Sequence, residues 1–311
     1  MNGTVAVTDF GWYDFLAARE LEEVNFWTPS DRRPFNAAPF SPFFFKLKAP
    51  HRAIAGFGYF AKWSSLPDWL AWDCFGEGNG TETLAELQLR LREIRQRIGY
   101  EPGSAAANIG CILIVQPRLF PRDAWIPQPS DWRDRTVSSK SYDLTTGEGF
   151  RIWNQCVERA ESFPLQIRGR LPLVAGPTGP RYGAPQLIGP RLGQGTFRIS
   201  VTDAYGRACA VTGEHSLPAL EAAHIRAYQA NGPHEIRNGI LLRADLHRLF
   251  DKGYVTIVDR RLRVSPRLRA DFSNGRSYYP LDGEPVRLPQ SQFDYPAEEF
   301  LSWHNETVYL R

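Results

Sequence analysis

Residues 220–253 read LEAAHIRAYQANGPHEIRNGILLRADLHRLFDKG, and their pattern predicts most about the C-terminal half of the chain. Its first residues, together with the alanine before them, predict a short strand over 219–225. Asn238-Gly239 predicts a tight turn, after which 240–242 predicts a second extended piece. The apolar spacing over 244–252 predicts a helix that ends before a glycine. A strand, a loop, a turn and a helix therefore follow one another within this one stretch.

Histidine and asparagine occupy three positions of this unit: His224 ends the strand, Asn238 stands at the turn and His247 lies on the helix. The apolar residues of the helix share its core side, which leaves His247 to project elsewhere. Four motifs resemble those of HNH endonucleases, and more closely the McrA-like branch found in modification-dependent restriction enzymes: CAVTG at 209–213, LEAAHI at 220–225, NGILL at 238–242 and DLHRLFDKG at 245–253. The resemblance covers roughly residues 190–260 and implies a ββα-metal nuclease domain.

This resemblance implies metal-dependent hydrolysis of phosphodiester bonds, with His224, Asn238 and His247 as the catalytic residues. His224 is then the general base and His247 a metal ligand, while Asn238 orients His224 by a hydrogen bond either to the backbone at the end of the strand or to the ring itself. The residue types suit the chemistry because neutral imidazole accepts a proton near pH 7. A divalent cation neutralises the charge that develops on the phosphate. One divalent ion per site is expected, either Mg²⁺, Mn²⁺ or another transition metal.

One position departs from the family pattern. Many HNH enzymes carry an acidic residue or a second histidine directly before the general base, whereas this chain has Ala223 there. Glu221 lies on the same face of the predicted strand and is the expected replacement as a metal ligand. Cys209 has no paired cysteine nearby, so no structural zinc is expected. His215 and His234 fall in predicted loops, and the sequence assigns them no role.

Arginines are expected to contact the DNA phosphates. Arg243 directly precedes the helix of the motif and Arg248 lies within it, and both can pair with phosphates next to the cleaved bond. Arg181 and Arg191 lie in the segment 161–195, which holds six prolines and seven glycines and is predicted to be an irregular linker. This basic linker is expected either to contact phosphates or to act only as a tether.

The length of 311 residues, at about 150 per domain, predicts two domains, 1–160 and 196–311, joined by the linker 161–195. The net charge of +3 permits nucleic-acid binding without demanding it. The four cysteines form no CxxC pair, which favours a reducing, cytoplasmic location over a disulfide framework. No stretch approaches the ~18 continuous apolar residues of a membrane helix, so no membrane partner is expected.

The N-terminal domain is predicted to mix helices and strands. FFFKLKAPHRAIAGFGYF at 43–60 predicts a hairpin, 109–115 a buried strand that ends at Gln116-Pro117, and 84–98 and 148–161 two helices. The hairpin run resembles the strand pairs of PUA-like domains, the superfamily that includes base-flipping SRA modules. The resemblance implies a PUA-like (SRA-like) β-barrel, and the whole chain is predicted to be an α+β protein.

A barrel of this kind can accept a flipped nucleobase between aromatic walls. The candidate residues of a modified-base pocket are Trp27, Tyr59, Trp63, Trp69, Trp72 and Asp73, the last as a partner for an exocyclic amine. The alternative for any one of these aromatic residues is ordinary packing in the core.

The sequence therefore predicts a DNA endonuclease of type IV-like restriction, which recognises modified double-stranded DNA through its N-terminal domain. Two alternatives remain open: an HNH nuclease of homing or toxin type that acts on unmodified DNA, and a non-catalytic DNA-binding reader. One active site per chain cuts one strand, so a homodimer or a transient dimer on DNA is expected.

Overall fold

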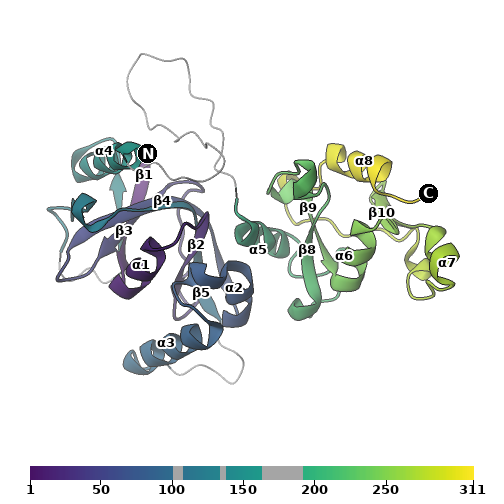
Figure 1. Ribbon diagram of the computed structural model, residues 1–311, viewed down its shortest axis with the longest axis horizontal. Coiled ribbons are helices and arrows are strands. Elements are labelled where there is room, and N and C mark those ends of the chain that lie inside the picture. The colour runs from purple at the N-terminus through teal and green to yellow at the C-terminus, as the bar shows by residue number, and fades with distance from the viewer. Residues whose placement is uncertain (101–107, 134–137, 163–191) are drawn as a thin grey trace, which may run out of the picture. The chain divides into compact units, whose positions relative to one another are not determined.

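The computed structural model describes residues 1–100, 108–133, 138–162 and 192–311 (Figure 1). The chain forms two compact units, Met1–Pro190 and Arg191–Arg311. Most of the predicted linker 161–195, including Arg181 and Arg191, lies outside the described residues. The described ends of that segment are helical, because one helix runs to Ser162 and the next begins at Gln194.

The N-terminal unit is built on one mixed sheet with the strand order β2-β5-β4-β3-β1-β7 (Figure 1). Strands β1 and β3 pair in parallel, whereas all other paired strands are antiparallel. The short strand β6 pairs with β4. The strand bounds are β1 Asn2–Thr8, β2 Glu23–Thr28, β3 Pro42–Leu47, β4 Ala53–Leu66, β5 Ile109–Leu119, β6 Ile126–Pro127 and β7 Ser139–Asp143. Helices complete the mixed fold: α1 Phe10–Ala17, α2 Asp68–Phe75, α3 Leu84–Arg97 and α4 Gly147–Ser162.

The predicted hairpin is confirmed as the antiparallel pair β3–β4 in the middle of the sheet. Side chains alternate between the faces of a strand, and all three phenylalanines of β3 are fully buried. Phe43 and Phe45 pack in the cluster to which α1 contributes, whereas Phe44 packs in the cluster to which α4 contributes. A central strand buried on both faces explains the uninterrupted apolar run that the sequence shows.

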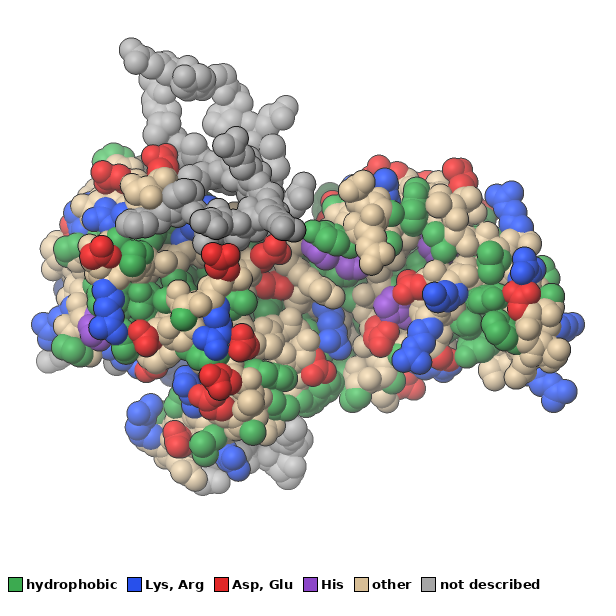
Figure 2. Space-filling model, viewed as in Figure 1, with side chains coloured by type: hydrophobic (Ala, Val, Ile, Leu, Met, Phe, Trp, Pro, Cys, Tyr) green, Lys and Arg blue, Asp and Glu red, His purple; other side chains and the backbone are tan. Residues whose placement is uncertain are grey.

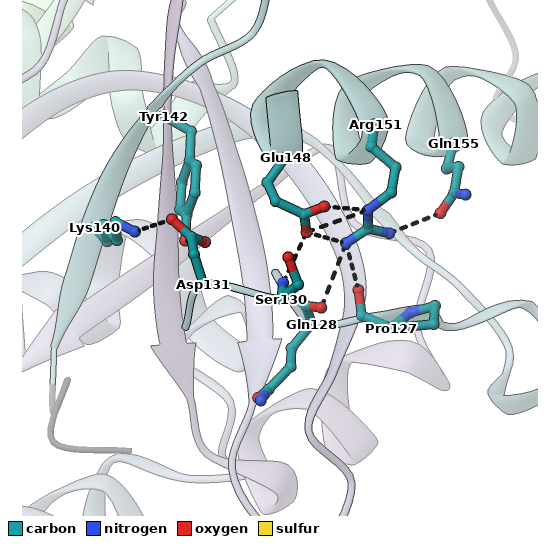
Figure 3. Close-up of polar contacts among 9 residues, drawn as sticks. All are labelled: Pro127, Gln128, Ser130, Asp131, Lys140, Tyr142, Glu148, Arg151 and Gln155. Carbon is teal, nitrogen blue, oxygen red and sulfur yellow. Dashed lines mark hydrogen bonds and ion pairs between the residues drawn. The ribbon is translucent and has the colours of Figure 1, made fainter. Parts of the chain in front are cut away.

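A network of polar contacts ties α4 and β7 to the segment between β6 and β7 (Figure 3). Arg151 of α4 pairs with Glu148 at 2.7 Å and also donates to the backbone carbonyls of Pro127 and Gln128. On the neighbouring strand, the Tyr142 hydroxyl donates to Asp131 at 2.7 Å, and Lys140 pairs with the same carboxylate. These contacts join three successive segments of the chain and so fix α4 against the segment that follows β6.

The structure corrects one prediction about this unit and leaves another unconfirmed. The strand predicted over 109–115 continues to Leu119, because β4 shifts register between Phe57 and Tyr59 and so accommodates Pro117, which has no N–H to donate. The β-barrel is not confirmed, since β2 and β7 end the strand order without pairing with each other in the described part of the chain. The predicted helices over 84–98 and 148–161 are confirmed as α3 and α4.

The C-terminal unit packs two hairpins between helices around one apolar core (Figure 1). Its elements are α5 Gln194–Ala204, β8 Leu220–His224, β9 Gly239–Arg243, α6 Ala244–Asp251, β10 Val255–Val258, β11 Arg261–Val264, α7 Arg267–Phe272 and α8 Glu298–Thr307. No helix among the described residues of either unit combines the length and the apolarity needed to cross a membrane.

Candidate active site

The predicted strand, loop and helix of the motif form a compact unit. β8 and β9 pair antiparallel, with His224 opposite Gly239 and Glu221 opposite Leu242. A Cβ atom at Gly239 would lie 2.3 Å from the Val201 side chain of α5, so only glycine allows this close packing. The predicted Asn238-Gly239 turn takes the form of a short 3₁₀ turn over Ile236–Asn238 that leads directly into β9.

The helix α6 starts directly after β9 and orients His247. Leu246 and Phe250 are four residues apart and fully buried, which fixes one side of the helix in the core. His247 projects from another side and remains partly exposed, with a side-chain exposure of 21%. The helix ends before Gly253, which has a φ of +77° and therefore terminates it as the sequence predicts.

His224 lies at the end of β8 between two aromatic partners. Its ring stacks on Phe197 with a centroid distance of 3.9 Å, and its Nε2 lies 2.9 Å from Nδ1 of His234. Burial lowers the pKa of His224 to about 4, and the charges of His234 and His247 lower it as well. The imidazole is therefore neutral at pH 7, which is the form that can accept a proton.

Two carboxylates face His247. Its Nδ1 lies 2.6 Å from Glu221 Oε2, and its Nε2 lies 3.3 Å from Asp251 Oδ2. Burial raises the pKa of Asp251, the charge of His247 lowers it and the charge of Glu221 raises it. Ala223, where many HNH enzymes carry a ligand, is fully buried in the core. Glu221, two residues earlier on β8, places a carboxylate beside His247 instead.

Asn238 does not touch the ring of His224. Its amide accepts from the Arg226 N–H and donates to the Arg226 and Pro233 carbonyls, at distances of 2.9 to 3.0 Å. The side chain is fully buried. Asn238 thus holds the loop between β8 and β9, whereas the sequence left open whether it contacts the backbone or the histidine ring.

The two arginines of the motif differ in their contacts. Arg243 forms two hydrogen bonds to the Asp245 carboxylate, at 2.6 and 2.7 Å, which raise the pKa of Arg243. The Tyr278 hydroxyl donates to the same carboxylate at 3.1 Å. A phosphate would have to compete with Asp245 for Arg243. Arg248 is exposed and has no ion pair within the described residues.

Two residues of this site escaped the sequence analysis. His234 lies in an irregular loop, where no periodicity signals a role, yet it contacts His224 directly. Asp251 lies four residues after His247 on α6, a spacing that places both side chains on one face of a helix and that could have indicated it. Histidine side chains reach the surface of the C-terminal unit among acidic and basic ones (Figure 2).

The donor chemistry of the site suits a divalent cation. An imidazole nitrogen and carboxylate oxygens are ligands for Mg²⁺, Mn²⁺ and related ions. Among the described residues, no three His, Cys, Asp or Glu side chains form a ready-made metal cluster. The contact between Glu221 and His247 nevertheless supplies a pair of donors, and such a pair leaves coordination positions for phosphate and water.

The structure does not bring the predicted pocket residues of the N-terminal unit together. Tyr59 is buried in the core cluster that includes α4. Trp27 lies opposite Cys111 and Trp63 opposite Ile112, so the two indoles project from opposite faces of the sheet. Trp69, Trp72 and Asp73 lie on α2, with both tryptophans half-buried and the aspartate exposed. A single pocket lined by all six residues is therefore wrong.

Comparisons with known proteins bear on the C-terminal unit. The family model described as HNH endonuclease matches residues 209–258, a stretch that contains β8, β9 and α6. The chain thus carries an HNH endonuclease domain. No curated protein matches the sequence.

Solved structures give weaker likenesses. The chain is similar to ASCH from Zymomonas mobilis, at 9% identity over 49% of this chain and 94% of that chain, with a TM-score of 0.32. It is also similar to a modification-dependent TagI restriction endonuclease, at 11% identity over 99% of this chain and 83% of that chain, with a TM-score of 0.29. At these TM-scores neither likeness supports a conclusion about fold or function.

Proposed function

We propose that this chain is a metal-dependent endonuclease that hydrolyses phosphodiester bonds of double-stranded DNA. The observation that supports it most directly is the arrangement within the matched domain. Glu221 and His247 are in contact, and His247 lies close enough to His224 for its charge to lower the pKa of that residue. A candidate base next to a pair of candidate metal ligands is what phosphodiester hydrolysis requires.

In this proposal His224 is the general base. Its neutral ring takes a proton from a water molecule, whose oxygen then forms a bond to phosphorus while the bond from phosphorus to the leaving oxygen breaks. The leaving oxygen takes up a proton from solvent. Stacking on Phe197 holds the ring in place during these steps, so that the ring loses little further rotational freedom before the reaction.

Glu221 and His247 would hold the divalent cation, with Asp251 next to them. When bound, the cation would neutralise the charge on the phosphate and stabilise the departing oxygen. The ring nitrogen of His247 that binds the cation would give up its contact with a carboxylate, whereas the other nitrogen would keep its carboxylate partner and so hold the ring in orientation. Arg248, which is exposed beside this histidine, would contact a flanking phosphate.

The test is cleavage of supercoiled plasmid by the full chain in the presence of Mg²⁺ or Mn²⁺. His224→Ala should reduce the rate about a hundredfold to ten-thousandfold, because a general base contributes that much. DNA binding should remain, since phosphate contacts do not involve this ring. His215→Ala is the matched control, since His215 is an exposed histidine of the same unit. Cleavage by His224→Ala at a tenth of the parental rate would overturn the assignment.

We further propose that the N-terminal unit reads modified DNA, as in type IV-like restriction. In this proposal the base-contacting residues are Trp27 of β2 and Trp69 and Trp72 of α2. The support is that these two elements pack together and that the three indoles are half-buried. The Trp27 indole N–H donates to the Asn79 carbonyl at 2.8 Å, which fixes its ring. Oriented, partly exposed rings of this kind can stack on a base.

Matched plasmids with and without modified cytosine test this second proposal. Preferential cleavage of the modified plasmid would support it, and equal cleavage across a panel of modifications would leave a nuclease of unmodified DNA. A chain that binds DNA but cuts neither plasmid at any metal concentration would be a non-catalytic reader. Cutting of both strands requires two active sites, so we expect two chains to act together on DNA.

A further inference from the structure

His234 lies in the loop between β8 and β9 and is the nearest polar neighbour of the candidate base. Its Nδ1 is 2.9 Å from His224 Nε2, a hydrogen-bond distance. The two rings are inclined by 61° with centroids 5.0 Å apart, so that they meet at their edges. This contact has no counterpart in the roles assigned to His224, Asn238 and His247 above.

Both rings of this pair are held from outside by aromatic side chains. Phe197 stacks on His224 at 3.9 Å with an interplanar angle of 13°. Tyr228 stacks on His234 at 4.6 Å with an angle of 14°. The four rings contact one another in the order Phe197, His224, His234 and Tyr228, so neither imidazole can rotate without losing a stacking contact. The hydrogen bond between the two histidines is therefore a fixed feature of the site.

We propose that His234 is a positioning residue, which accepts a hydrogen bond from the Nε2–H of His224 and so leaves His224 Nδ1 free to take the proton from water. This inference rests on the proposed nuclease function and deepens it. It assigns the proton-accepting atom as well as the residue, and it identifies the group that selects this atom.

In a neutral imidazole one ring nitrogen donates a hydrogen bond and the other accepts one. Nε2 of His224 is engaged with His234. Nδ1 of the same ring has no hydrogen-bond partner within the described residues and is not fully buried, so water can reach it. Only the tautomer with the hydrogen on Nε2 gives Nδ1 a free lone pair, and that tautomer requires an acceptor at the position of His234.

Asn238 contributes to the same arrangement through the backbone. Its amide donates to the carbonyl of Pro233, the residue directly before His234, at 2.9 Å. The same amide accepts from and donates to the backbone of Arg226, two residues after His224. One buried asparagine therefore fixes both ends of the loop that carries His234. A side chain that only accepts or only packs could not make these three contacts.

Two substitutions of His234 separate the acceptor from the stacked ring. His234→Phe keeps a ring on Tyr228 and removes the acceptor, whereas His234→Asn places an amide oxygen close to the position of Nδ1. We expect His234→Phe to lower kcat about tenfold to hundredfold, the usual cost of losing a group that orients an active residue. KM and the Kd for DNA should change less than about twofold, and His234→Asn should recover most of the loss.

Equal activity of the two variants, or a loss that resides in KM, would overturn the proposal. A direct readout is the ¹⁵N spectrum of the full chain labelled in histidine, with His224→Ala used to assign the signal. The parent should show His224 with the hydrogen on Nε2, and His234→Phe should show a mixture of tautomers. A parent with the hydrogen on Nδ1 would also overturn it. If the parent cuts no DNA, the nuclease proposal fails, while this spectrum still tests the role of His234.

Discussion

The two units contrast in how their candidate residues are distributed along the chain. In the C-terminal unit the whole site, from Glu221 to Asp251, comes from two adjacent strands, one loop and the next helix. In the N-terminal unit the predicted pocket residues come from β2, β4 and α2, and the register of the sheet sends Trp27 and Trp63 to opposite faces. Residues that are close in sequence can be grouped from sequence, whereas residues on different strands require the register.

The two units also differ in how far the side chains of their polar contacts are exposed to solvent. Among the contacts in Figure 3, those of Arg151 with Glu148 and with backbone carbonyls hold α4, and these two side chains are only 30% and 24% exposed. The contacts of His247 instead join one imidazole to two carboxylates that remain 41% and 53% exposed. Polar groups that stay open to solvent retain the capacity to bind a ligand.

Next to the loss expected for His224→Ala, the greatest loss of activity is expected at the candidate metal ligand His247. His247→Ala should lower plasmid cleavage about a hundredfold at low Mg²⁺, because the cation loses its nitrogen donor while Glu221 remains. Raising Mn²⁺ should recover part of the activity, since a missing ligand weakens metal affinity before it abolishes the chemistry. The measurement is the cleavage rate across a metal titration, with His215→Ala as the control. Complete indifference to metal in parent and variant would argue against a metal role.

A second set of substitutions tests whether the tryptophans of α2 contribute to DNA binding, whereas the buried Tyr59 does not. Trp69→Ala or Trp72→Ala should weaken binding to modified duplex roughly tenfold, which is within the range for loss of one aromatic ring stacked on a base. Tyr59→Phe should leave binding unchanged, because Tyr59 lies in the core at 5% exposure. Fluorescence anisotropy with matched duplexes measures both. If Tyr59→Phe has the larger effect, the division between core and pocket residues is wrong.

How much the sequence predicts follows from these locations. The amphipathic spacing of α6, the glycine that ends it and the strands beside it are local features, and each was predicted from the sequence. The partner of His224 was not, because His234 lies in a loop whose path depends on three hydrogen bonds of Asn238. The burial of Tyr59 could not be predicted from the sequence either, since it depends on pairing between β4 and β5 with two register shifts.

Acid should destabilise the C-terminal unit through a histidine outside the site. His304 of α8 is buried at 2% exposure, with Nδ1 hydrogen-bonded to Thr256 and Nε2 to the Phe250 carbonyl. Burial lowers the pKa of His304 to about 4, against about 6.5 in an unfolded chain. Between these pH values the unfolded chain binds a proton that the folded chain does not. The free energy of unfolding should therefore fall as the pH falls, by about 1.4 kcal/mol per pH unit.

Urea unfolding between pH 7 and pH 5 measures this dependence, and His304→Gln provides the comparison. The variant can still donate to the Phe250 carbonyl but cannot titrate, so its unfolding free energy should depend less on pH than that of the parent. His224, whose pKa is also about 4, should account for part of the dependence that remains. Equal slopes for parent and variant would show that His304 is not the group responsible.

A smaller effect is expected to distinguish Arg243, which precedes α6, from Arg248, which lies on it. Arg248→Ala should weaken DNA binding alike on all sequences and reduce the slope of log K against log salt by about 0.9, the value for one lost phosphate contact. Arg243→Ala should change this slope less, because two hydrogen bonds to Asp245 already engage that guanidinium. Since phosphate contacts carry no sequence information, neither variant should alter the preference between modified and unmodified duplexes. A preference that changed in Arg248→Ala, while every substitution on α2 left it intact, would move recognition from the N-terminal unit into the nuclease unit.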